Sequence, residues 1–213
     1  MYLKNVTLIC VAGVEIEKSY QAFLYSTKDI HYGGYVFISP CIPSNFSDKH
    51  TYIKCDKLTP TSFSEFMFYE LYKYFSTSHC LFVHHDGFVL NYNLWDDEFL
   101  NYDYIGAPWP FNSNNPNANL VGNGGFSLRS KKILELPSVK NIKLISTNDM
   151  PYPVEDMNYC AYNLKTFLDN NIKYAPIQLA SKFSTEINIP SISRESFGFH
   201  SFKFNPQYSN ILI

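Results

Sequence analysis

Short apolar runs alternate with longer amphipathic segments over the first 87 residues of the chain. The runs are rich in branched and aromatic residues, which predicts buried strands. The expected strands cover residues 7–13, 35–40, 51–55 and 80–87. Between them, residues 15–29 and 62–78 repeat apolar positions at helical spacing, and Ser62 and Glu65 have the spacing of a capping box. Strands separated by helices predict βαβ units, in which helices cover both faces of a mostly parallel sheet.

From residue 88 onward the pattern is less regular and richer in aromatic and turn-forming residues. Residues 112–120 have too little apolar content to pack, so we expect a mobile loop there. Residues 131–136 predict a short helix, and residues 173–180 predict a strand. Another helix is expected to begin at Glu155 or Asp156. It would bury a stripe formed by Met157, Cys160, Ala161, Leu164 and Leu168.

The length of 213 residues allows one sizeable core and predicts a single α/β domain, residues 1–213, with a Rossmann-like first half. No apolar run approaches the roughly 18 residues of a membrane span. Residues 1–18 superficially resemble a signal peptide but lack a small-x-small cleavage site, so a buried first strand explains them better. We therefore expect a soluble protein without a membrane span.

Cysteine usage and charge indicate the environment and the partners. Five cysteines are scattered without a CxxC pair, which favours buried, reduced thiols in the cytoplasm over disulfides or a zinc site. The formal net charge is −2, and the only arginines are Arg129 and Arg194. Since no basic patch of the kind that binds a phosphate backbone is visible, nucleic acid is not an expected partner.

The strand that ends in LFVHHDG offers the first candidate site. Ligands of open α/β sheets bind beyond the carboxyl ends of the strands. Because side chains alternate along a strand, His84 and Asp86 are expected on one side and His85 on the other. An imidazole nitrogen and a carboxylate oxygen so placed can hold one divalent cation. Alternatively, His84 is a partly buried polar residue and the Asp-Gly pair only makes a turn.

The segment GNGGFSLRS, residues 122–130, is the second candidate. Its glycines allow close approach of the backbone and positive φ angles, so that N–H groups could face a phosphate or a sugar hydroxyl. It lacks the lysine of a P-loop and the spacing of a dinucleotide site, and a plain tight turn is the alternative. Arg129 could hold a diphosphate by a forked contact or be an ordinary surface arginine.

The acidic pair Glu155 and Asp156 opens the next helix. A carboxylate there can cap free N–H groups, which explains one acid better than two. A carboxylate that faces the strand ends could instead act as a general base. His200, in the string FGFH, is either a packing residue or part of the site if the tail folds back over His84 and Asp86.

Several strings in this order resemble a known family. They are HHDGFVLN, WDDEFLNYDYIGAPW, VGNGGFSLRS, VEDMNYC, ASKFSTE and FGFH, and they span residues 80 to 200 or so. They resemble a glycosyltransferase family of bacteria and viruses that is known mainly as a domain of unknown function. The layout is also similar to that of GT-A glycosyltransferases, including the fringe-like and core-galactosyltransferase groups. The resemblance implies one GT-A-like domain, with a nucleotide-binding half at residues 1–87 and an acceptor and catalytic half at residues 88–213.

Such enzymes have a DxD motif at a strand end, a GG-aromatic loop, an ED pair that opens a helix and often a late, metal-binding histidine. The DxD position falls on residues 84–86, where histidine replaces the first aspartate. The resemblance therefore implies a divalent cation, Mn²⁺ or Mg²⁺. Its implied ligands are Asp86, His200 and His84. The implied base of an inverting reaction is Asp156 or, failing that, Glu155.

The implied donor is a nucleotide sugar, with a UDP-sugar as the first choice, and the implied acceptor is a glycan hydroxyl. Val11, Ala12 and Gly13 would lie beside the base and the ribose. The other implied donor contacts are His84, Asp86, Gly124, Gly125 and Arg129. Two further functions stay open. One is an inactive nucleotide- or sugar-binding module that lost its metal through the change to His84. The other is a metal-dependent hydrolase built on His84, His85, Asp86 and His200.

Overall fold

The computed structural model describes residues 1–110, 118–148, 150–190 and 195–212. The strands are β1 (Tyr2–Val11), β2 (His31–Ser39), β3 (Thr51–Lys54), β4 (His79–Phe82), β5 (Tyr104–Ile105), β6 (Ala107–Pro108), β7 (Val121–Gly122), β8 (Ser127–Ser130), β9 (Ser184–Thr185) and β10 (Gly198–Phe199). The α-helices are α1 (Ile16–Tyr25), α2 (Pro60–Tyr69), α3 (Lys131–Lys140), α4 (Glu155–Met157), α5 (Leu164–Asp169) and α6 (Ile177–Phe183). Short 3-10 helices cover Leu71–Tyr74, Tyr92–Leu94, Asp97–Asn101 and Pro206–Tyr208, and a π-helical turn covers Asn158–Tyr162.

The central sheet has the strand order β3-β2-β1-β4-β8-β5. The first four of these strands are parallel to one another, whereas β8 is antiparallel to both of its neighbours. The expected mostly parallel sheet is therefore confirmed. Because β8 runs the opposite way, its first residue, Ser127, lies beside Phe82, the last residue of β4. The loop that enters β8 thus meets the carboxyl ends of β1 and β4 at one edge.

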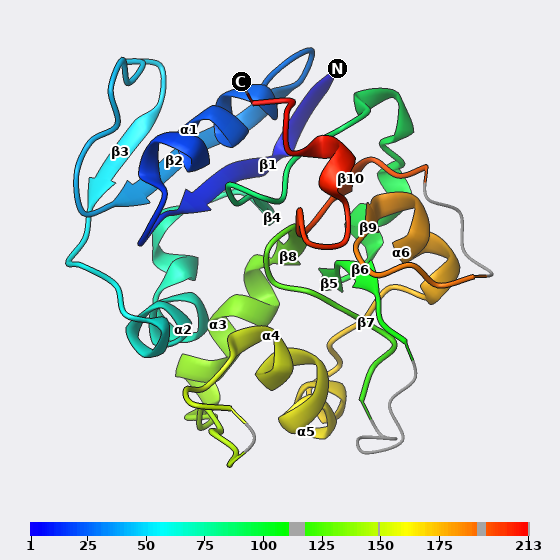
Figure 1. The fold of residues 1–213 in the computed structure, drawn as a ribbon. Coiled ribbons are helices and arrows are strands. Elements are labelled where there is room, and N and C mark those ends of the chain that lie inside the picture. Colours follow the sequence, from blue (N-terminus) through cyan, green and yellow to red (C-terminus); the bar gives the residue numbers. More distant parts are fainter. Residues whose placement is uncertain (111–117, 149, 191–194, 213) are drawn as a thin grey trace.

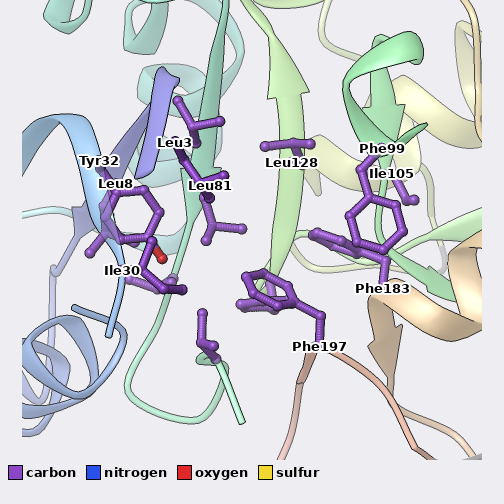
Figure 2. Packing of buried hydrophobic residues seen from close by; sticks show 14 of the residues in the cluster. Leu3, Leu8, Ile30, Tyr32, Leu81, Phe99, Ile105, Leu128, Phe183 and Phe197 are labelled. Carbon is purple, nitrogen blue, oxygen red and sulfur yellow. The ribbon is translucent and has the colours of Figure 1, made fainter. Parts of the chain in front are cut away.

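Successive side chains along the central strands point to opposite faces of the sheet and belong to two hydrophobic clusters, one on each face. Leu8 and Leu81 belong to the face that α1 and α6 cover, where Phe183 and Phe197 complete the packing (Figure 2). Ile9 and its neighbours on the opposite face pack against α2, α3 and the segment that follows Tyr159. Figure 1 shows α2, α3, α4 and α5 grouped on that side of the sheet. This is the three-layer α/β arrangement that the alternating pattern predicts.

Helix α2 begins earlier and ends earlier than expected. Its N-cap is Thr59, whose hydroxyl accepts the Ser62 N–H, while the Ser62 hydroxyl accepts the Thr59 N–H. The capping box that we expected between Ser62 and Glu65 is therefore wrong, because Pro60 fixes the first helical residue and moves the cap upstream. The helix stops at Tyr69 and continues only as a short 3-10 turn.

The strand expected at residues 173–180 is also wrong, because the second half of that segment, residues 177–180, belongs to α6. Only Tyr174 makes a β-bridge, to Tyr104. Pro176 then occupies the N-cap of the helix, where its lack of an N–H is harmless. Leu179, Ala180 and Phe183 follow at helical spacing and are buried.

Two other segments complete the comparison with the expected elements. Most of the polar loop expected at 112–120 lies outside the described residues, but Asn119 donates its N–H to the carbonyl of Cys160 at 2.8 Å. The C-terminal tail returns to the sheet, because β10 pairs in parallel with β9 and Gly198 bridges Val89. None of the helices in the described residues combines the length and the apolar character needed to span a bilayer.

Candidate active site

A tight turn directly after β4 carries the HHD string. His84 and Gly87 exchange two backbone hydrogen bonds of 2.8 and 3.0 Å, so His85 and Asp86 form the tip of the turn. The alternation that we expected is wrong, because β4 ends at Phe82 and its geometry does not extend to these residues. One ligand atom from each of His84, His85 and Asp86 lies within 4.8 Å of the other two. The segment is thus both a turn and a cluster of metal-ligand types.

Three imidazole rings surround the Asp86 carboxylate. Its Oδ1 atom lies 3.0 Å from His84 Nδ1, 3.9 Å from His85 Nδ1 and 3.7 Å from His200 Nε2. Burial by itself would raise the pKa of Asp86, but the hydrogen bond with His84 and the charges of the histidines outweigh burial and lower it. The carboxylate is therefore held in its ionised form.

The donor set fits a divalent cation. Among the described residues, the Nδ1 atom of His85 is buried without a hydrogen-bond partner, although it lies near an ionised carboxylate. A buried polar atom normally has a partner, and an ion could serve as one here. Three imidazoles beside one carboxylate suit a transition metal better than Mg²⁺, which prefers oxygen ligands. The ligand set that the resemblance implies did not include His85, which entered the sequence interpretation only in the alternative of a metal-dependent hydrolase.

The tail brings His200 to this turn. The His200 N–H donates to the carbonyl of Thr185 at 2.9 Å, and the Ser201 N–H donates to the carbonyl of Asp86 at 2.7 Å. His200 Nδ1 lies 2.9 Å from Glu186 Oε1. Burial by itself would lower the pKa of His200, but Glu186 and Asp86 outweigh burial and raise it. His200 is thus neither remote from the site nor a plain packing residue.

The glycines of the loop before β8 are required for space. No glycine of the described chain has a positive φ; Asn123 takes that conformation instead, with φ 75°. A Cβ atom on Gly124 would collide with the Glu155 carboxylate, and one on Gly125 would collide with the His200 ring. The loop is therefore packed between the acidic helix start and the late histidine.

Helix α4 begins with the acidic pair, but neither acid is its N-cap. The N-cap is Val154, which has no capping side chain. Asp156 accepts the Gly124 N–H at 2.8 Å and is half-buried. Burial raises the pKa of Asp156 to about 7, and the negative charge of Glu155 adds to the effect, while Arg129 and the Gly124 N–H oppose it. A carboxylate of this kind can exchange a proton near neutral pH.

Arg129 lies behind the site and is fully buried. Its guanidinium donates to Glu155 Oε1 at 2.8 Å and to the carbonyl of Gly124 at 3.2 Å. The rings of Phe82, Tyr104 and Tyr159 surround it at 5.3 to 5.8 Å. It is not a surface arginine, and the forked contact with a diphosphate that we expected is not open to a guanidinium with no exposed surface. Arg129 instead joins the glycine loop to Glu155.

A cavity of about 180 Å³ opens where these elements meet. Its walls are Phe63, Phe82, His84, Gly124, Gly125, Glu155, Asp156 and His200. Asp86 lies directly behind the two histidines of this wall. The structure thus brings Asp156 and His200 to one cavity and Asp86 into contact with His200, although these three residues lie far apart in the sequence.

A second cavity of about 300 Å³ adjoins the first and shares Phe63, His84 and Glu155 with it. It extends to Gly13 and Tyr152 and is otherwise lined mainly by apolar side chains. The remaining residues of the β1 end, Val11 and Ala12, are fully buried and do not reach it. Phe63 and Tyr152 were not expected in the site, and no motif in the sequence distinguishes them from other aromatic residues.

Comparison with solved structures supports the fold. The galactosyltransferase LgtC, solved with donor and acceptor sugar analogues, aligns with a TM-score of 0.51 and 12% identity over 91% of this chain and 86% of LgtC. A glycosyltransferase involved in glycosylation of the major capsid of PBCV-1 aligns with a TM-score of 0.52 and 12% identity over 97% of this chain and 98% of its own. Both neighbours are GT-A glycosyltransferases, and at such identity the similarity shows a GT-A-like fold.

At the level of sequence, no curated protein matches the chain. A family described as "Protein of unknown function (DUF5672)" matches residues 51–200, which is more than half of the sequence and includes all the candidate residues except those at the end of β1. The chain therefore belongs to the DUF5672 family.

Proposed function

We propose that this protein is a glycosyltransferase that moves a sugar from a nucleotide-sugar donor to a hydroxyl group of a glycan acceptor. The observation that carries the proposal is the convergence on one cavity of two kinds of group: the half-buried Asp156 carboxylate and the histidines around Asp86. Together with a GT-A-like fold, these groups supply a base and a charge-binding site beyond the strand ends.

The two adjoining cavities suggest how a donor would lie. The larger, mainly apolar cavity beside Gly13 suits the flat base and the ribose of a nucleoside, and a UDP-sugar is the first donor to test. The diphosphate would then reach the smaller cavity beside His84 and His200. Asp86, His84, His85 and His200 would hold a divalent cation there, which when bound neutralises negative charge on the leaving nucleoside diphosphate.

Asp156 is the residue that we propose as the general base. Its pKa, raised to about 7, allows the carboxylate to accept a proton from an acceptor hydroxyl near neutral pH. The hydrogen bond from the Gly124 N–H orients the Asp156 carboxylate, while the Glu155 carboxylate is paired with the guanidinium of Arg129. Attack by the deprotonated oxygen on the anomeric carbon, opposite to the leaving diphosphate, would invert the anomeric configuration in one step. We also propose that the protein works in the cytoplasm, a reducing compartment in which its five free cysteines would stay reduced.

The central test is the Asp156→Asn variant. We expect it to lower the rate of transfer by about 10²- to 10⁴-fold, the usual contribution of a positioned base, and to leave donor affinity unchanged. Transfer would be measured with a panel of UDP-sugars, Mn²⁺ and glycan acceptors, and donor binding by calorimetry. The control is Asp48→Asn, at an exposed aspartate. A variant that keeps more than about a tenth of the wild-type rate would exclude Asp156 as the base.

The same assay separates the two other candidate functions. An inactive binding module would bind the donor with no transfer in the wild-type protein. A metal-dependent hydrolase would consume the donor without any acceptor at the rate seen with one. The anomeric configuration of the product, determined by NMR, tests inversion independently of these outcomes.

A further inference from the structure

A carboxylate outside the cavity wall touches its late histidine. Glu186 directly follows β9, and His200 directly follows β10. These strands pair in parallel with Thr185 opposite Phe199, so the residues that follow them, Glu186 and His200, lie side by side. The result is the 2.9 Å contact between Glu186 Oε1 and His200 Nδ1.

The chemistry of this contact fixes where the proton of the imidazole lies. An ionised carboxylate can only accept a hydrogen bond, so Nδ1 of His200 must be the donor. In the neutral ring, Nε2 is then left with its lone pair free. Nε2 is the atom that faces Asp86, at 3.7 Å from Oδ1. The lone pair is thus directed toward the group that would share a cation with it.

Neighbouring groups restrict movement of the pair. The backbone of Gly125 lies so close to the His200 ring that a Cβ atom would not fit between them. The Asn205 side chain donates to the carbonyls of Glu186 and His200 at 3.1 and 2.9 Å. Both the ring and the strand end that carries the carboxylate are therefore tied to the same tail.

We infer that Glu186 is a positioning residue: by accepting the Nδ1 hydrogen of His200, it leaves Nε2 as the ring nitrogen that faces Asp86 and serves as a cation ligand. The inference rests on the cation site of the proposed function. A carboxylate behind a ligating histidine fixes the tautomer and raises the basicity of the ligand, and its loss typically weakens metal binding by about 10- to 100-fold.

The test is Mn²⁺ affinity, measured by calorimetry on the whole chain without any donor. Glu186→Ala should weaken binding by about 10- to 100-fold, and Glu186→Gln by less, because its amide oxygen can still accept the Nδ1 hydrogen. His200→Ala should weaken binding as well, and the double variant should bind no more weakly than His200→Ala alone. Glu98→Gln, at an exposed glutamate in the 3-10 helix Asp97–Asn101, should bind as the wild type does.

Each outcome decides the question. If Glu186 merely held the tail in place, its removal would add to the effect of His200→Ala, and the inference would be wrong. It would also be wrong if Glu186→Ala bound Mn²⁺ within about twofold of the wild type, well short of the loss expected. Should Glu186→Ala fail to fold, judged by melting in EDTA, Glu186→Gln in the same cycle decides. Mn²⁺ binding that depends on Glu186 in a protein without transferase activity would overturn the proposed function and leave this inference intact.

Discussion

Glu155 and Asp156 are adjacent residues whose carboxylates have different partners. Glu155 faces the full positive charge of Arg129 at 2.8 Å, whereas Asp156 accepts a hydrogen bond from a neutral peptide group, the Gly124 N–H, also at 2.8 Å. A hydrogen bond to a cation compensates a buried negative charge better than one to a neutral donor. The neutral partner is consistent with the raised pKa of Asp156, which suits this carboxylate to proton transfer.

Replacing Asp156 with Asn should stabilise the protein at pH 8 and leave its stability nearly unchanged at pH 4. The folded state raises the pKa of Asp156 to about 7, from about 3.9 in an unfolded chain. Folding therefore favours the protonated acid, and the stability that this contributes below about pH 4 is lost as pH rises through about 7. Asparagine does not ionise, and its amide oxygen can still accept the Gly124 N–H.

Thermal melting from pH 4 to pH 8 in EDTA measures this effect, with Asp48→Asn as the exposed control. The difference in Tm between Asp156→Asn and the wild type should grow with pH, at roughly 2 to 4 °C for each kcal/mol recovered. A difference that stays constant across this range would mean that Asp156 titrates alike in the folded and unfolded states.

At the scale of elements, the interruption between α4 and α5 decides which side chains are buried. The π-helical turn at Asn158–Tyr162 uses more residues per turn than an α-helix, so the side chains after it are rotated around the axis. Phe167 is consequently buried, while Leu168 is 52% exposed. The stripe that we expected was wrong at Leu168, because regular spacing from Met157 cannot anticipate the inserted turn.

A matched pair of substitutions tests this change of phase. Phe167→Ala should lower the free energy of unfolding by about 3 to 5 kcal/mol, since it empties space in the cluster around Tyr159 and Phe68. Leu168→Ala should change it by less than about 0.5 kcal/mol, as is usual at the surface. Urea unfolding of both variants provides the measurement. Similar losses in the two would show that the helix runs without the extra turn in solution.

At the scale of the whole molecule, the layers of the fold could be predicted from the sequence, but the contacts that assemble the site could not. Strands β1 and β2 and the helix between them, α1, follow from apolar periodicity, which is a local signal. The reversed direction of β8 has no local signal, because it depends on which strand Ser127 meets in space. The burial of Arg129 was missed for the same reason, since its partner Glu155 is 26 residues away.

Residues that carry chemistry were easier to anticipate than the residues that hold them. Asp86, Asp156 and His200 stand out by residue type near strand and helix ends, and the structure brings Asp156 and His200 to one cavity, with Asp86 beside His200. Phe63 has no such signal, because aromatic residues in helices are common in cores. Glu186 ends the string ASKFSTE, but its residue type alone gave it no role, since a glutamate after a short strand is common at surfaces. Their contribution depends on contacts that only the three-dimensional fold creates.

The backbone hydrogen bond of 2.7 Å from the Ser201 N–H to the carbonyl of Asp86 has a consequence for how an ion would enter. Main-chain atoms join the tail to the turn, and no metal-ligating side chain takes part in this bond. The conformational entropy lost in bringing the metal ligands together is therefore lost on folding and not on ion binding. Hydrogen exchange at the Ser201 amide should accordingly be equally slow with and without Mn²⁺. Faster exchange in the ion-free protein would mean that the ion itself recruits the tail.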